Sequence, residues 1–176
     1  MAETKAKRTS TKKATVEDGV SEDDFTDADL EKRVLVRNIA DWDVCFRLRE
    51  VEGDALITKN SKRRFTRNEI QAQVYNGNNL FSGVDGKGSH ATLYIEDAPT
   101  RRWLNFETKD EPQMIFTDET VKKLFAMSDD VFRATLSQYI VTRAEKYALM
   151  EAIERLKLND YRKIIYCSEY TGRPIK

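Results

Sequence analysis

Apolar and polar residues alternate along residues 42–49, as expected for a β-strand with one buried face. The apolar side of this strand comprises Trp42, Val44, Phe46 and Leu48. Short runs at 34–39, 55–58, 90–97 and, after a turn at Pro99, 101–107 predict further strands, and Asp85-Gly86 before the run at 90–97 is a hairpin signal. We therefore expect residues 31–116 to form a small, mostly antiparallel β-rich unit.

One short helix is expected inside this unit. Thr66-Arg67-Asn68-Glu69 has the spacing of a capping box, in which Thr66 and Glu69 cap each other's backbone N–H groups. After Pro112 the apolar residues recur at helical spacing, and Thr142 and Glu145 form a second capping box. Residues 117–176 are therefore predicted to be a helical lobe of three or four short helices, which makes the fold class α+β.

Residues 1–30 differ from the rest of the chain because they are charged and have few apolar residues. Residues 1–13 carry a net charge of +4, whereas residues 14–31 carry eight acids and no base. Such a segment buries too little surface to offset its ordering entropy, so we expect an arm that is disordered when free or ordered by a partner. The arm residues expected to contact a basic partner surface are Asp24, Phe25, Asp27, Asp29 and Leu30.

The composition excludes several classes of protein. The 176 residues balance 30 basic against 30 acidic side chains, and no apolar run reaches the length of a membrane-spanning helix. The first residues lack the apolar core of a secretory signal, so none is expected. Two cysteines, Cys45 and Cys167, are too few for a disulfide scaffold.

A basic loop is the sharpest surface feature of the sequence. Its five bases lie within nine residues: Lys59, Lys62, Arg63, Arg64 and Arg67. Three interpretations remain open, namely an ordinary charged loop, a docking patch for an acidic partner such as the arm of another copy, and phosphate contacts with nucleic acid. The zero net charge argues against a dedicated nucleic-acid-binding protein.

The glycine-rich stretch at 83–89 fits a hairpin tip better than a phosphate loop. Lys87 is followed by glycine, and a strand rather than a helix is expected next, so the Walker pattern fails. The predicted tip residues are Asp85, Gly86, Lys87 and Gly88, whose backbone could lie flat against another protein.

No coherent catalytic or metal site is predicted. His90 is the only histidine, and it has no nearby cysteine with which to hold zinc. A triad of Asp85, Ser89 and His90 is conceivable, but adjacent strand residues point to opposite faces. We therefore expect no cofactor and no metal.

Residues 78–91 and 94–97, with 146–149 and 156–161, resemble small virion-associated proteins of tailed bacteriophages. The resemblance covers residues 33–172 loosely and transfers no functional residues. It implies a capsid-associated or head–tail accessory protein, found in the virion or in the host cytoplasm during assembly.

The hypothesis that these features favour is a non-enzymatic structural subunit that binds other protein subunits through its arm and charged loops. Several copies in one assembly are expected, and no membrane partner. The alternatives are a nucleic-acid-binding accessory factor that uses residues 59–67, and a small enzyme built around residues 85–90.

Overall fold

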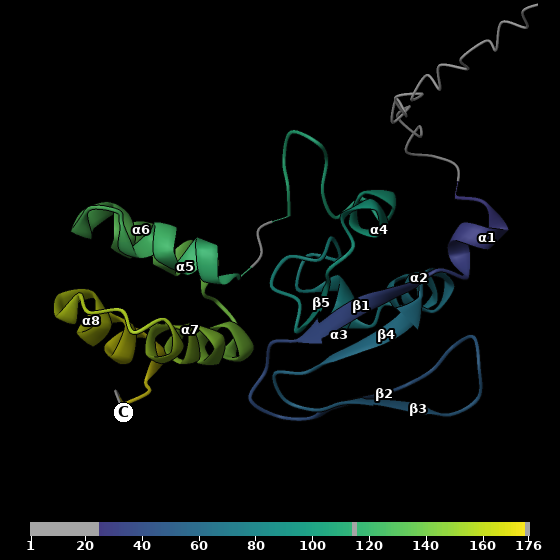
Figure 1. Cartoon of the computed structure of the whole chain (residues 1–176), viewed down its shortest axis with the longest axis horizontal. Coiled ribbons are helices and arrows are strands. Elements are labelled where there is room, and N and C mark those ends of the chain that lie inside the picture. The colour runs from purple at the N-terminus through teal and green to yellow at the C-terminus, as the bar shows by residue number, and fades with distance from the viewer. Residues whose placement is uncertain (1–24, 114–115, 175–176) are drawn as a thin grey trace, which may run out of the picture.

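The computed structural model describes residues 25–113 and 116–174. Strands and short helices from the first part of the chain lie beside a group of helices from the second part (Figure 1). The strands are β1 (Arg33–Asn38), β2 (Val44–Arg47), β3 (Asp54–Ile57), β4 (Lys62–Thr66) and β5 (Leu93–Ile95). The helices are α1 (Asp27–Leu30), α2 (Arg67–Tyr75), α3 (Asn79–Ser82), α4 (Ala98–Trp103), α5 (Asp118–Phe125), α6 (Asp129–Tyr139), α7 (Arg143–Arg155) and α8 (Tyr161–Thr171). The α+β fold class predicted from the sequence is confirmed.

Two small antiparallel sheets form the frame of the β-rich unit. The first has the order β4-β1-β5, and the second pairs β2 with β3. Buried Asn38, the last residue of β1, joins them, because its side-chain amide donates to the carbonyl oxygens of Ile57 (3.1 Å) and Trp42 (2.8 Å). A buried amide that finds several acceptors stabilises this corner and fixes one arrangement of the two sheets.

Phenylalanines fill the core between the sheets and α3. The ring centroids of Phe46 and Phe81 lie 5.1 Å apart in an edge-to-face arrangement, and the Phe65 ring centroid lies 5.6 Å from that of Phe46. On β2, Val44 and Phe46 are buried while Cys45 and Arg47 are exposed. The alternation predicted for this strand is therefore confirmed.

Three sequence expectations within this unit are wrong. Residues 85–88 are not the tip of a hairpin, because helix α3 rather than a strand precedes them. Gly83 begins the loop with a φ of 68°, and a Cβ there would lie 2.0 Å from the Ser89 carbonyl oxygen. Helix α4 replaces the expected strand after Pro99, because Asp97 caps its first turn and proline suits that turn. Trp42, expected in the core, is 36% exposed.

The helical lobe follows the prediction closely. Four helices, α5 to α8, surround a core that includes Phe132, Leu136 and Leu149. The predicted capping box is present on α7, and the chain leaves α8 through Gly172 at a φ of 68°. Among the described residues, no helix is long and apolar enough to cross a membrane.

Replacing Phe81 by alanine should lower the free energy of unfolding by about 3–5 kcal/mol, because a fully buried ring leaves a cavity beside Phe46. Tyr75, which is 74% exposed, provides the control, and Tyr75→Ala should cost less than about 0.5 kcal/mol. Urea unfolding measures both. Equal losses in the two variants would contradict this description of the core.

Candidate functional site

The root of the N-terminal arm, residues 25–30, forms several polar and aromatic contacts with the β-rich unit. Thr26 and Asp29 form a capping box around α1, in which each accepts the other's backbone N–H. A helix of one turn is not stable alone, so α1 depends on what it packs against. Figure 1 shows α1 at the end of the β-rich unit that faces away from α5–α8.

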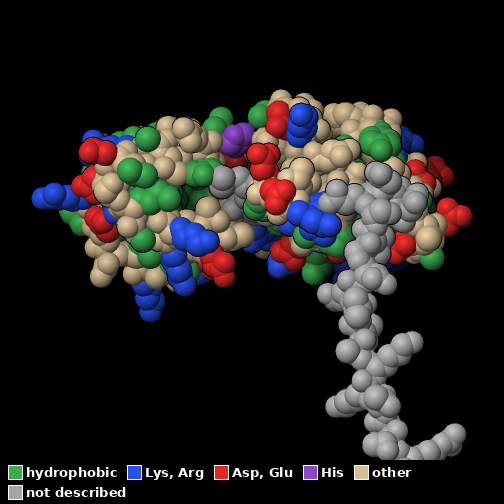
Figure 2. Space-filling view, turned by 90° about the horizontal axis from the view of Figure 1, so that it is seen from above, with side chains coloured by type: hydrophobic (Ala, Val, Ile, Leu, Met, Phe, Trp, Pro, Cys, Tyr) green, Lys and Arg blue, Asp and Glu red, His purple; other side chains and the backbone are tan. Residues whose placement is uncertain are grey.

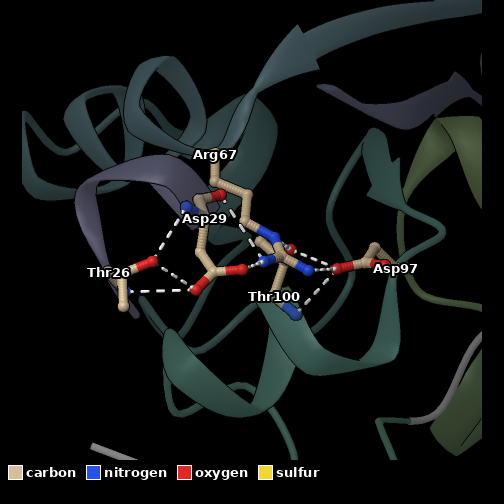
Figure 3. Close-up of polar contacts among 5 residues, drawn as sticks. All are labelled: Thr26, Asp29, Arg67, Asp97 and Thr100. Carbon is tan, nitrogen blue, oxygen red and sulfur yellow. Dashed lines mark hydrogen bonds and ion pairs between the residues drawn. The ribbon is translucent and has the colours of Figure 1, made fainter. Parts of the chain in front are cut away.

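Arg67, the first residue of α2, is the centre of these contacts (Figure 3). Its side chain donates from Nη2 to the Asp97 carboxylate at 2.8 Å and from Nε to the Thr100 hydroxyl at 3.0 Å. Nη1 lies 3.8 Å from the Asp29 carboxylate. The guanidinium also stacks on the Phe25 ring at 4.2 Å. We call these five residues the arm dock.

The Arg67 side chain at the centre of the arm dock is buried. Arg67 is only 2% exposed, so its charge has left water and needs these partners. The Phe25 ring also meets Trp103 of α4 edge-on, with centroids 5.0 Å apart. The arm dock therefore joins α1, α2 and α4 through one cation and one aromatic ring.

The Asp97 carboxylate contacts both α4 and α2. Its carboxylate accepts the Thr100 backbone N–H at 3.1 Å, which caps α4, and it also accepts the Arg67 guanidinium. Burial alone would raise the pKa of Asp97. The hydrogen bonds from Thr100 and Arg67 outweigh burial, so the pKa lies below its ordinary value. The carboxylate is therefore held in its charged form by the fold.

The structure changes the role expected for the arm residues. Phe25 and Asp29 contact the chain's own β-rich unit, although the sequence suggested them as anchors on a partner. The reason is that the unit supplies an aromatic ring and a buried guanidinium within reach. Leu30 is half-buried and Asp27 exposed, whereas Asp24 lies outside the described residues. Residues 25–30 thus pack with the unit that the sequence placed after residue 30.

The predicted basic loop is not a single loop or a single surface. Lys62, Arg63 and Arg64 lie on strand β4, where successive side chains point to opposite faces. Arg63 folds over the Phe65 ring and donates to the Leu56 carbonyl oxygen. Arg67 is buried in the arm dock, and Lys59 lies in the turn before β4. Only part of the expected patch is available to a partner.

A second polar cluster ties the β-rich unit to the helical lobe. His90 Nδ1 lies 2.8 Å from the Glu145 carboxylate, whose other oxygen accepts the backbone N–H groups of Val141 and Thr142. Figure 2 shows the single histidine, in purple, at the waist between the two halves. Glu145 is buried, and it caps α7 while it orients His90. One buried carboxylate thus contacts both sides of the junction.

Further contacts line the same junction. The buried residues Ile39, Ala40 and Ala144 form its apolar part. Its other side-chain contacts include Arg173–Asp41, Asn60–Glu151 and Arg37 to the Phe116 carbonyl oxygen. A cleft of about 690 Å³ opens beside them, with both basic and acidic side chains on its walls. This mixed lining favours no single class of small ligand.

The groups considered for catalysis are engaged elsewhere. Asp85 accepts the backbone N–H groups of Lys87 and Ser89, which closes its own turn, so it does not orient His90. Cys167, which the sequence raised only in connection with disulfides, is buried, and burial raises the pKa of its thiol to about 12, so that the thiol stays protonated at neutral pH. Across residues 25–113 and 116–174, no group of three or more potential metal ligands is clustered.

Two contacts of the site were missed by sequence reasoning. The pairing of Arg67 with Asp97 spans thirty residues, and that of His90 with Glu145 spans fifty-five. The spacing of Thr26 and Asp29 is that of a capping box, a helix-start signal that the prediction of an arm disordered when free overlooked.

Comparison of the chain with protein-family models, with curated proteins and with solved structures finds no match. The function therefore has to be inferred from the chain's own residues.

Replacing Arg67 by methionine should lower the free energy of unfolding by about 1–3 kcal/mol, because the half-buried Asp97 carboxylate loses its cation. Backbone amides of α1 should also exchange faster with solvent, since α1 loses its main contact. The exposed neighbour Arg64 provides the control, and Arg64→Met should change stability by less than about 0.5 kcal/mol. Urea unfolding and hydrogen exchange test this, and equal behaviour of both variants would contradict the arm dock.

Acid should weaken the arm dock. The folded-state pKa of Asp97 is lowered, so its stabilising contribution is present above the unfolded pKa of about 3.9 and lost as pH falls through the folded value. Asp97→Asn should therefore be less stable than the native chain near neutral pH, and the gap should narrow below about pH 4. Unfolding free energies across this pH range measure the gap, for which Asp110→Asn in an exposed loop is the control. A gap that stays constant would exclude this role.

Proposed function

We propose that this protein is a non-enzymatic interaction subunit, which holds the root of its arm in the arm dock and offers the residues before it to partner subunits. The observation that carries the proposal is the burial of Arg67 against Phe25, Asp29 and Asp97. A buried cation is expensive unless several groups surround it. Here two of those groups come from the arm itself, so the arm root is part of the folded body.

Anchoring the root lowers the cost of binding through the arm. A segment that leaves a fixed point has fewer arrangements to lose when a partner orders it than a segment on a mobile root. The residues before the arm dock keep the charge separation of the sequence, with +4 on residues 1–13 and five acids without a base on 14–24. Such a segment suits partner surfaces that carry charge of the opposite sign.

The place of this subunit in an assembly is inferred from the sequence resemblance. The resemblance at residues 78–91 and 94–97, with 146–149 and 156–161, supports a component of a tailed-phage particle, either capsid-associated or a head–tail accessory protein. Several copies would act together in the virion, or in the host cytoplasm during assembly. The arm dock does not depend on the kind of assembly, because it only fixes the point from which the arm leaves the folded unit.

Removing residues 1–24 tests the arm directly, because Phe25 and every described contact remain. Chain purified from its native source should elute in an assembly heavier than the 20.4 kDa monomer, whereas the shortened chain should elute as a monomer. Light scattering after size exclusion measures both masses, and urea unfolding verifies that the shortened chain stays folded. Assembly that survives the deletion would rule out the arm as the interaction element.

A further inference from the structure

Another hollow, of about 510 Å³, opens on the β-rich unit beside the junction with the helical lobe. It lies between the loop after β2, the connection from α2 to α3, and the loop that leads into β5. Polar side chains on its wall include Arg49, Asn76, Asn78, Asn79, His90 and Thr92. The described residues of this wall include no acid, whereas the cleft of about 690 Å³ has acidic side chains on its wall. We call this site the asparagine hollow.

The frame of the asparagine hollow is fixed by polar contacts within the protein. The Asn78 side chain accepts the Leu80 N–H at 3.1 Å and donates to the Gln73 side chain at 2.7 Å, which holds the connection from α2 to α3. Buried Glu69 accepts the backbone N–H of Arg49 at 3.0 Å, which holds the loop after β2. A wall that is already formed loses little conformational freedom when a ligand binds.

Other polar groups on the wall are left for a ligand. Within residues 25–113 and 116–174, no group forms a hydrogen bond or ion pair with the Arg49 guanidinium, the Asn79 side-chain amide or the Thr92 hydroxyl. Arg49 and Asn79 are exposed, and Thr92 is half-buried. These three groups come from three separate segments and converge on one hollow, as polar groups do in small-molecule sites.

His90 sets the chemistry at the side of the hollow that faces the junction. Its Nδ1 lies 2.8 Å from the Glu145 carboxylate, and an ionised carboxylate only accepts, so Nδ1 carries a proton. In the neutral imidazole Nε2 is then an acceptor, and it suits a donor such as a ligand hydroxyl. The side chain is 23% exposed, and Figure 2 shows it at the surface of the waist.

We propose that the asparagine hollow binds a small polyhydroxylated anion of the size of a sugar phosphate or a sugar acid. The anionic group lies at Arg49, because a guanidinium pairs with phosphate or carboxylate and no acid on the described wall competes with it. The hydroxyl groups lie between Asn79, Thr92 and His90, since side-chain amides both donate and accept. A volume of about 510 Å³ is within the range of small-molecule sites, which is about 300–1,000 Å³. This site goes beyond the proposed function and does not depend on the arm.

Two-dimensional amide NMR spectra of the full-length chain test this proposal with glucose 6-phosphate, glucuronate, glucose and inorganic phosphate as probes. The two anionic sugars should each shift the amide signals of Arg49 and of residues 76–80 and 89–92, with a dissociation constant of about 1 mM or less. Glucose and inorganic phosphate should each bind at least about tenfold more weakly, because each lacks one half of the recognised chemistry. The tighter of the two anionic sugars identifies the preferred anion.

Substitutions on the wall locate the site. Arg49→Gln should weaken the binding of glucose 6-phosphate at least about tenfold, because a charge-assisted contact with the phosphate is lost. Asn79→Ala should weaken it about threefold to tenfold, as expected for one hydrogen bond. The matched control, Arg47→Gln, removes the same charge from an exposed position on β2 outside the hollow and should leave binding unchanged. Urea unfolding verifies that each variant is folded.

Other outcomes overturn the proposal. Equal weakening by Arg49→Gln and Arg47→Gln would mean a general attraction of charge, and inorganic phosphate that binds as tightly as glucose 6-phosphate would mean an anion site without sugar recognition. Glucose that binds as tightly as the anionic sugars would mean that Arg49 takes no part. Signals that move at residues 116–119 and 148–155 instead would place the ligand in the cleft at the junction.

The absence of a saturable shift with either anionic sugar up to about 10 mM would exclude the site. None of these results bears on the masses of the native and shortened chains, so the proposed function is tested separately.

Discussion

A buried guanidinium is the constraint on which the N-terminal half of this protein depends. Arg67 cannot be taken out of water without partners, and the fold supplies them from two other helices, α1 and the start of α4. The aromatic face of Phe25 adds a contact that a carboxylate alone would not give, because a desolvated cation over a ring is stabilised by the ring quadrupole. One side chain therefore determines where the arm ends and the folded body begins.

Two carboxylates, one in the arm dock and one at the junction between the two halves, each form a second contact besides capping a helix. Asp97 and Glu145 both cap a helix and both accept a donor distant in sequence. A capping carboxylate is already oriented by its helix, so a second donor costs less entropy than it would against a free side chain. Short helices are thereby coupled to tertiary contacts, which explains how one-turn elements such as α1 persist in the fold.

Local patterns predicted most of the elements, and pairings between distant residues decided the rest. The alternation around Val44 and the capping box of Thr142 and Glu145 were read correctly, because each depends on neighbours in sequence. At Thr66 only half of the predicted box forms, since Glu69 instead accepts the N–H groups of Arg49 and Glu50. The five bases at 59–67 do not share one surface, because strand β4 ends at Thr66 and helix α2 begins at Arg67. A count of charges along the sequence cannot show this change of element.

Basic side chains that are close in the sequence also lie on one face of a strand in the structure. On β1 the inward residues are valines and two of the three outward ones are arginines, so the strand that builds the core also builds a cationic surface. The arm dock lies at the end of that surface, because Thr66 pairs with Arg33 directly before Arg67 turns inward. The zero net charge of the chain is therefore compatible with strong and directed interactions.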